Sequence, residues 1–317
     1  MTDTATAPAR LRIDETRLAL AGAGTAVCAW GASSVLAKAI DMGAMAIGTY
    51  RFGLYAVGIL LWMRWRGPSP SWRMLRHSLW GGLALTADVA LFFSAVRTTT
   101  VADASVVGSL QPLVIMAIGV PLFGERVSLR DGLLALVALA GVIGVVVASA
   151  GSPEWNVRGD LLAFGAVLGW SGYFVFSKRS AGVLTSTEFT AGTAIWVALA
   201  NVPLAWLFGQ SLAPPPARDW VLLGVMTIGS GVFGHSLMNW SLVRIPLWVG
   251  STMTLLIPVA SALLAWAALG EPLTAAQLAA MAVVIGALFA IVRNQTKRPP
   301  ADASLDASGQ GRRPAAS

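Results

Sequence analysis

The sequence has 317 residues, of which 56% are hydrophobic and only 12% are charged, and its mean hydropathy is +0.70. Soluble domains carry roughly a quarter charged residues, so this composition excludes a water-soluble globular protein. The formal net charge of +7 does not indicate a nucleic-acid-binding face, because the basic residues lie in short gaps between apolar runs and in the two tails.

Ten apolar runs follow one another along the chain, each close to the roughly twenty residues that a helix needs to cross the hydrocarbon core of a bilayer. In chain order we expect membrane-spanning helices at Leu18–Ile40, Ala44–Met63, Leu79–Val96, Val101–Leu122, Gly132–Ala150, Leu161–Ser177, Phe189–Phe208, Trp220–Val243, Leu247–Leu269 and Ala275–Val292. The predicted fold class is therefore an all-α integral membrane protein with ten transmembrane helices.

Both ends of the chain are expected outside this helical region. Residues 1–17 are polar and are predicted to form a cytoplasmic segment. The apolar run that follows is too long for the core of a signal peptide, so we interpret it as the first helix. Residues 294–317 are rich in Pro, Ala, Ser, Gly and Arg, a composition that cannot bury a core, and are expected to form a disordered cytoplasmic tail.

The basic residues predict how the helices are oriented. With a cytoplasmic N-terminus, 17 of the 22 basic residues fall on the cytoplasmic side. Arg51 lies within a span, and the outer side receives only Lys38, Arg97, Arg158 and Arg218. Cytoplasmic loops carry the excess of Lys and Arg in membrane proteins, so we expect both termini in the cytoplasm and the chain in the plasma membrane, which in a bacterium is the inner membrane.

The two halves of the chain share motifs. In each half, eleven residues separate a proline from a Gly-Glu pair. The matching motifs are Pro112…Gly124-Glu125 with Pro258…Gly270-Glu271, and Trp30…Lys38 with Trp170…Lys178. We therefore expect two five-helix repeats, at residues 18–150 and 151–293. An odd number of spans inverts the second repeat in the membrane, an arrangement typical of secondary transporters with a site near the midplane.

These motifs, together with Trp30-Gly31 and Tyr50-Arg51-Phe52, resemble those of the drug/metabolite transporter (DMT) superfamily, specifically its ten-helix EamA-type members. The resemblance covers about residues 18–293 and implies a basket-like bundle with a central cavity. The superfamily includes exporters of amino acids, aromatic ones among them, and of other metabolites. For this chain the resemblance implies a transporter, not an enzyme, which exports small metabolites, amino acids above all, by alternating access.

Polar side chains within spans tend to face the interior of a helix bundle, so their distribution predicts which helices line a cavity. The fifth span has no strongly polar side chain from Leu133 to Ala148, and the tenth has none from Leu278 to Val292. We expect these two spans at the periphery, where Gly141 and Gly144 would support either helix packing or dimerisation. The other eight spans are expected to surround a wet cavity.

Both polar and aromatic residues are candidates for substrate binding: Trp30, Ser33, Ser34, Asp88, Phe92, Gln111, Trp170, Tyr173, His235 and Asn239. The polar groups would orient the charged backbone of a small substrate, and the aromatic groups would enclose its side chain. For every one of them, ordinary packing or hydrogen bonding within the bundle is the alternative.

Five residues have two interpretations each. Arg51 and Asp88 are the only charges well inside the predicted spans, so they either form a structural ion pair or face the cavity and its substrate; the family motif favours a structural role for Arg51. Pro112 and Pro258 interrupt equivalent helices and are either hinges or static kinks. His235 is a candidate proton site as well as a binding candidate.

Two other functions remain open. Gly169-Trp170-Ser171-Gly172, with His235 two helices later, fits the pattern of a rhomboid-type intramembrane serine protease, but ten spans in an inverted repeat do not. Small multidrug exporters of lipophilic cations use a carboxylate in the first helix, which this chain lacks, although Asp88 keeps such a substrate possible.

The expected partners are a small-molecule substrate and the lipid bilayer, for a protein that is a monomer or a homodimer. We expect no nucleic acid and no cofactor. With two histidines and one cysteine far apart, a metal site has little support.

Overall fold

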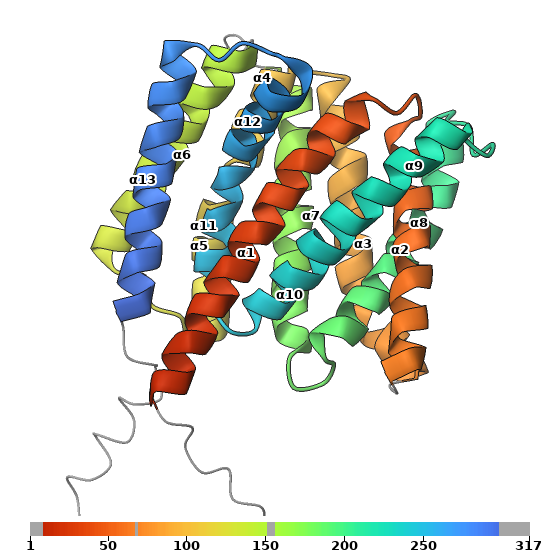
Figure 1. The fold of residues 1–317 in the computed structure, drawn as a ribbon, viewed down its shortest axis with the longest axis horizontal. Coiled ribbons are helices and arrows are strands. Elements are labelled where there is room, and N and C mark those ends of the chain that lie inside the picture. Colours follow the sequence, from red (N-terminus) through yellow and green to blue (C-terminus); the bar gives the residue numbers. More distant parts are fainter. Residues whose placement is uncertain (1–8, 67–68, 151–155, 298–317) are drawn as a thin grey trace, which may run out of the picture.

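The computed structural model describes residues 9–66, 69–150 and 156–297, and within these ranges every regular element is a helix (Figure 1). In chain order they are α1 (Ala9–Lys38), α2 (Ala44–Arg66), α3 (Trp72–Val96), α4 (Val101–Gly108), α5 (Gln111–Phe123), α6 (Leu129–Ala150), α7 (Val157–Ser180), α8 (Ser186–Leu207), α9 (Ala217–Met226), the π-helix η1 (Thr227–Ser236), α10 (Leu237–Leu242), α11 (Leu247–Met253), the 3₁₀-helix η2 (Thr254–Leu256), α12 (Ile257–Leu269) and α13 (Ala275–Lys297).

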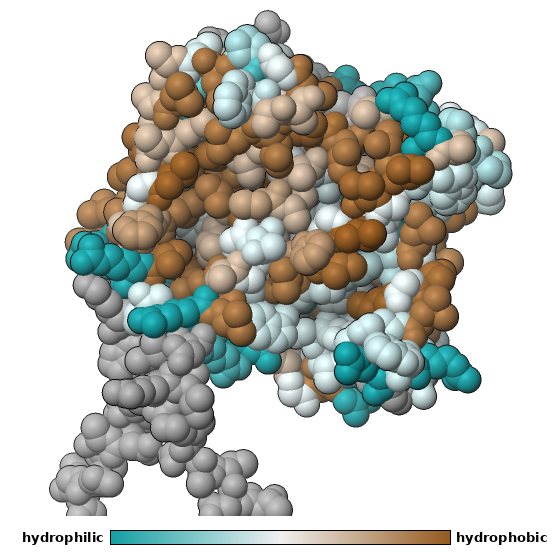
Figure 2. Space-filling model, viewed as in Figure 1, coloured by the Kyte–Doolittle hydropathy of each residue, from teal (hydrophilic) through white to brown (hydrophobic). Residues whose placement is uncertain are grey.

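These elements combine into ten helical segments, each long and apolar enough to cross a membrane, which confirms the predicted fold class. Large apolar side chains such as Trp65, Leu161 and Phe289 are exposed on the outside of the bundle. Figure 2 shows a face on which hydrophobic side chains cover most of the middle and hydrophilic ones gather towards the ends. This surface is suited to lipid and not to water.

Several helices extend beyond the predicted spans because polar residues cap them. The third span was predicted from Leu79, but α3 begins at Trp72, where the Ser71 hydroxyl accepts a hydrogen bond from the backbone N–H of Met74 at 3.2 Å. Arg73 and Arg76 occupy the first turns, and a helix continues through such residues once it is capped. Thr185 and Glu188 form a reciprocal capping box at the start of α8 in the same way.

The fourth and ninth spans are interrupted at equivalent places, as predicted. Pro112 and Pro258 each lie in the first turn of a new helical segment, α5 and α12, after a break that follows α4 and α11. Both of these segments end at a left-handed glycine, Gly124 with φ 63° and Gly270 with φ 70°, a backbone conformation that residues with a Cβ rarely adopt. The shared proline-to-glycine spacing therefore encodes the same segment in both halves.

The eighth span differs from the continuous α-helix expected at Trp220–Val243. Its middle part, η1, is a π-helix that contains Gly229, Gly231 and Gly234. Such segments carry one extra residue per turn and shift the side chains that follow them, and they are frequent at functional sites. Here the shift places His235 in the interior of the bundle, where it is 3% exposed.

Helices α6 and α13 form one edge of the bundle and α2 and α8 the opposite edge (Figure 1). Helix α6 lies so close to α13 that a Cβ atom added to Gly141 would stand 2.8 Å from Cγ2 of Val284. One added to Gly144 would stand 3.2 Å from the Cβ of Ala280. These two glycines thus serve helix packing within the chain, which is one of the two roles that the sequence left open for them.

Candidate functional site

A cavity of about 960 Å³ lies among α1, α3, α4, α5, α6, α7, η2, α12 and the start of α13. Its volume is at the upper end of the roughly 300–1,000 Å³ that is typical of small-molecule sites. The lining is mainly apolar and aromatic, and its polar members are Asp88, Ser105, Ser109, Gln111, Ser149, Thr254, Ser261, Glu271, Thr274 and Gln277. A cavity of this composition can hold a small molecule that has both an apolar body and a polar end.

The cavity reaches the surface at the end of the bundle that lies opposite the start of α1 and the end of α13. Its lining continues along the last residues of α6 to the turn between α12 and α13, where Glu271, Pro272 and Thr274 are exposed. Figure 1 shows this turn at the top of the bundle, whereas α1 begins and α13 ends at the bottom. Gln111 and Thr254, which also line the cavity, are 1% and 8% exposed, so the cavity extends from the surface into the interior.

Five of the ten predicted substrate-binding candidates line the cavity: Trp30, Asp88, Phe92, Gln111 and Trp170. The indole rings of Trp30 and Trp170 meet edge to face with their centroids 5.0 Å apart. The two residues come from equivalent positions of the two sequence repeats, on α1 and α7. Together with Phe92 they give the wall an aromatic surface on which an apolar side chain can stack.

Tyr173, His235 and Asn239 are buried behind the aromatic wall and do not line the cavity. The Tyr173 hydroxyl and His235 Nδ1 are 3.1 Å apart, and Asn239 Nδ2 donates to the same hydroxyl at 2.8 Å. Ser177 in turn donates to Asn239 Oδ1 at 2.7 Å. The rings of His235 and Tyr173 also contact the two tryptophans, with centroids 5.3 Å apart for Trp30 and His235 and 5.6 Å apart for Trp170 and Tyr173. This cluster is placed to hold the aromatic wall in position.

The remaining polar candidates lie elsewhere. Ser33 is buried outside the cavity lining, and the side chain of Ser34 lies outside the described residues. Arg51 donates to the Ser230 hydroxyl of η1 and lies 4.3 Å above the Phe52 ring. No hydrogen bond or ion pair joins Arg51 to Asp88 in the described part of the chain, so the expected alternative of a structural pair is wrong. The two residues belong to different helix pairings, α2 with η1 and α3 with α7.

Two expectations about the lining helices also need correction. The fifth and tenth spans were expected to lie apart from the cavity, but Val145, Val146, Ala148 and Ser149 of α6 and Gln277 of α13 line it. Hydropathy cannot separate an apolar residue that faces lipid from one that faces an apolar cavity wall. Conversely, none of the described residues of α2, α8 or α9 belongs to the lining, and their polar side chains serve contacts between helices. Of the two proline candidates, Pro258 lines the cavity and Pro112 does not.

The arrangement does not support a serine protease. A serine–histidine dyad requires a hydrogen bond between the two side chains. In the described residues the buried Ser171 hydroxyl has no hydrogen-bond partner, and His235 Nδ1 is paired with Tyr173. His, Cys, Asp and Glu residues also form no group of three that could hold a metal ion within this part of the chain.

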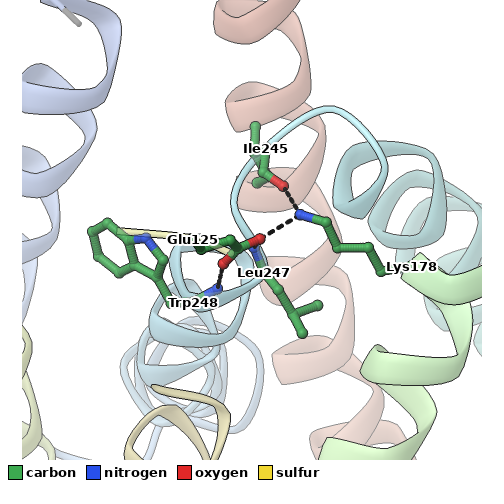
Figure 3. A network of polar contacts seen from close by, with 5 residues as sticks. All are labelled: Glu125, Lys178, Ile245, Leu247 and Trp248. Atoms are coloured by element: carbon green, nitrogen blue, oxygen red, sulfur yellow. Dashed lines mark hydrogen bonds and ion pairs between the residues drawn. The ribbon is translucent and has the colours of Figure 1, made fainter. Parts of the chain in front are cut away.

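At the end of the bundle where α1 begins and α13 ends, a polar network joins three segments (Figure 3). Lys178 at the end of α7 donates to Glu125 Oε1 at 2.5 Å and to the carbonyl oxygen of Ile245 at 2.9 Å. Glu125 also accepts from the backbone N–H groups of Leu247 at 2.6 Å and Trp248 at 3.3 Å. The network thereby ties the turn after α5 to α7 and to the start of α11.

The sequence identified Glu125 and Lys178 as matching members of the repeats but did not predict that they bind each other. Their shared position at the predicted cytoplasmic end of two spans was the available signal. Thr254 is another residue whose role appears only in three dimensions: it donates to Gln111 Oε1 at 2.9 Å and so fixes a side chain of the cavity from the other half of the chain.

Comparison with known proteins agrees with this architecture. The family model described as the EamA-like transporter family matches the chain twice, at residues 17–147 and 157–293. A solved crystal structure superimposes with a TM-score of 0.74 at 23% identity, covering 88% of this chain and 99% of that one, a likeness that shows the fold alone.

Two curated relatives have names that state a substrate class. The aromatic amino acid exporter YddG of Ancylobacter novellus is 34% identical over 155 residues, 48% of this chain and 52% of the exporter, so the match spans about half of that relative. A probable amino-acid metabolite efflux pump of Salmonella typhimurium is 25% identical over 66% of this chain and 73% of the pump. The family and these relatives are transporters and not enzymes. Because the two matches to the family model together span most of this chain, the protein is an integral membrane transporter that belongs to the EamA-like transporter family.

Proposed function

We propose that the protein exports amino acids with aromatic or other large apolar side chains. The observation that carries this proposal is the cavity wall formed by Trp30 and Trp170, which offers ring faces and edges beside a small number of polar groups. The names of the two curated relatives support the same substrate class. Transport would proceed by alternating access, in which the cavity opens to one side of the membrane at a time.

Counterflow in liposomes tests the proposal directly. Purified protein is reconstituted into vesicles loaded with unlabelled phenylalanine, and the uptake of labelled phenylalanine is measured against competing tryptophan and alanine. We expect tryptophan to compete well and alanine poorly. In the Trp170→Ala variant the preference for phenylalanine over alanine should fall about tenfold, because a buried aromatic contact contributes on the order of 1 kcal/mol beyond its area.

A lipophilic-cation exporter is the second candidate, favoured by one specific observation. Among the lining residues that the structure describes, Asp88 and Glu271 are acidic and none is Lys or Arg. Vesicles that fail to exchange any amino acid, but exchange tetraphenylphosphonium in a manner abolished by Asp88→Asn, would establish this function in place of the first.

We further propose that the protein lies in a bacterial inner membrane with both termini in the cytoplasm, supported by the distribution of basic residues. The cavity would then face outward in the conformation described here. Cysteines introduced at Ser69 and Pro215 test the orientation: an impermeant maleimide added to intact cells should label the second and not the first. Labelling of both from the same side would contradict the arrangement.

A further inference from the structure

The polar groups of the cavity wall differ in whether the protein itself satisfies them. Ser109 and Ser261 donate to backbone carbonyl groups, and Gln277 donates to Ser149. Asp88 has no hydrogen bond or ion pair to any described residue, and buried Gln111 Nε2 has no acceptor among them. Gln111 is buried and Asp88 is partly buried. A polar group that is removed from water without a partner costs free energy, so such groups in a binding cavity point to a ligand that completes them.

Asp88 brings a carboxylate to the aromatic part of the wall. It lies on α3, and a Cβ atom added to Gly169 of α7 would stand 2.8 Å from the backbone nitrogen of Asp88. Trp170 directly follows that glycine, so the acid is anchored beside one of the two tryptophans. A carboxylate is a hydrogen-bond acceptor and attracts a cationic nitrogen, most strongly where the surroundings are apolar.

Gln111 supplies the opposite kind of group. Thr254 holds its Oε1 atom, and the amide nitrogen is left with two N–H groups to donate. An acceptor such as a carboxylate satisfies both of these N–H groups. Because Gln111 is the first residue of α5 and follows the break after α4, the break itself places the amide in the interior of the bundle.

Both residues lie at a similar depth. Asp88 is eight residues before the end of α3, Trp30 is eight residues before the end of α1, and Gln111 is ten residues after the start of α4. With a rise of 1.5 Å per residue, each lies about 12–15 Å from the end of the bundle at which the cavity opens. Asp88, Gln111, Trp30 and Trp170 also line the same cavity, and this shared lining is what allows one small ligand to contact the acid, the amide and the tryptophan wall together.

We propose that Asp88 and Gln111 together recognise a zwitterion, with the ligand ammonium group at the Asp88 carboxylate and the ligand carboxylate at the Gln111 amide. This assignment rests on the proposed function and specifies which residues bind the ammonium and carboxylate groups of the amino acid. The side chain of the ligand then extends towards Trp30 and Trp170.

Three ligands that share a phenyl ring separate the two contacts. Phenylalanine carries both charged groups, 2-phenylethylamine lacks the carboxylate, and 3-phenylpropionate lacks the ammonium group. Their dissociation constants are measured by isothermal titration calorimetry on the purified wild-type protein and on the variants Asp88→Asn and Gln111→Glu. The second variant keeps the oxygen that accepts from Thr254 and replaces the donor with an acceptor. Asp41→Asn, at an exposed position outside the cavity lining, is the matched control.

The proposal expects a crossed pattern. Asp88→Asn should weaken phenylalanine and 2-phenylethylamine by about tenfold or more, equal to about 1.4 kcal/mol, and leave 3-phenylpropionate unchanged. Gln111→Glu should weaken phenylalanine and 3-phenylpropionate to a similar extent and leave 2-phenylethylamine unchanged or bound more tightly. The control should bind all three like the wild type.

Other outcomes overturn the proposal in distinguishable ways. Equal weakening of all three ligands would mean that Asp88 and Gln111 shape the cavity but do not recognise the charged groups of the ligand. Unchanged binding of phenylalanine in both variants would mean that other residues bind its ammonium and carboxylate groups. In either case wild-type counterflow of phenylalanine would still uphold the proposed function. A wild-type protein that neither binds nor exchanges phenylalanine would refute both.

Discussion

At the scale of single residues, Tyr173 illustrates how a buried polar side chain can support a site without touching the ligand. Its hydroxyl group connects α7 to His235 on η1 and to Asn239 on α10. The ring is fully buried and contacts Trp170 on the cavity side. The position of the aromatic wall therefore depends on hydrogen bonds that lie behind it.

Removal of this hydroxyl should destabilise the protein. Tyr173→Phe leaves Asn239 Nδ2 with its bond to Thr190 only and deprives His235 Nδ1 of its partner. An unsatisfied buried group costs about 1–3 kcal/mol, so we expect a clear decrease in the midpoint of thermal unfolding in detergent. Tyr50→Phe is the matched control, since that hydroxyl makes one bond, to the Leu212 carbonyl at 2.7 Å, near the edge of the bundle. A midpoint that falls no more in Tyr173→Phe than in the control would show that the network contributes little.

Tyr173 also shows that the sequence predicts which polar side chains lie in the interior of the bundle, but not which of them face the cavity. Polarity within a span indicated that Asp88, Gln111, Tyr173 and His235 face the interior, and all four do so in the sense that none points to lipid. Whether an interior polar group faces a cavity or another helix depends on rotations that the π-helix η1 and the break before α5 impose. Those rotations are set by packing across the bundle, which a single sequence pattern does not encode.

At the scale of elements, the contact between α6 and α13 depends on the absence of a side chain at Gly141. A Cβ atom there would stand 2.8 Å from Val284 and 3.2 Å from the carbonyl oxygen of Ala280. Gly141→Ala should therefore force the two helices apart and cost about 1–3 kcal/mol of stability. Gly286→Ala on α13, where an added Cβ meets nothing within 4 Å, is the control and should be neutral or slightly stabilising. Equal unfolding midpoints for the two variants would show that α6 can shift at no cost.

The segments that begin at Pro112 and Pro258 allow a test of hinge motion. Replacement of either proline by Ala restores a backbone N–H and should favour a continuous helix. If the breaks permit rocking, phenylalanine exchange in vesicles should slow several-fold, while the dissociation constant changes little. Pro203→Ala, inside α8 and away from the cavity, should exchange at the wild-type rate. Parallel losses of rate and affinity would identify the breaks as fixed features of the site.

Sequence patterns predicted these elements well, because membrane crossing, capping and glycine-terminated segments leave local signals. The ten spans and both interruptions follow from apolar length and from two prolines. The part played by α6 in the cavity could not be predicted, since Val145 and Val146 read as lipid-facing residues. Their side chains line the cavity only because of the position of the α12–α13 turn relative to α6.

At the scale of the whole molecule, the two repeats suggest how the cavity changes sides. In this conformation the end of the bundle at which α1 begins and α13 ends carries the network of Glu125 and Lys178, whose side chains are only 9% and 19% exposed. The repeat-equivalent glutamate, Glu271, is exposed at the cavity mouth at the other end. If the halves exchange roles, closure of the mouth would require the contacts between Glu125 and Lys178 to separate.

The equilibrium between these two states should therefore respond to the loss of the Glu125 carboxylate. Glu125→Gln weakens the contacts that hold the present state, and a change of about 1.4 kcal/mol shifts a two-state equilibrium tenfold. With Cys28 replaced by Ala and a cysteine introduced at Ala148 on the cavity wall, labelling by an impermeant maleimide reports how often the mouth is open. We expect Glu125→Gln to slow this labelling. Glu15→Gln is the control, because its pair with Arg244 is 55% exposed on the glutamate side and such surface pairs contribute little. Labelling that is as fast in Glu125→Gln as in Glu15→Gln would mean that the network does not hold the present state.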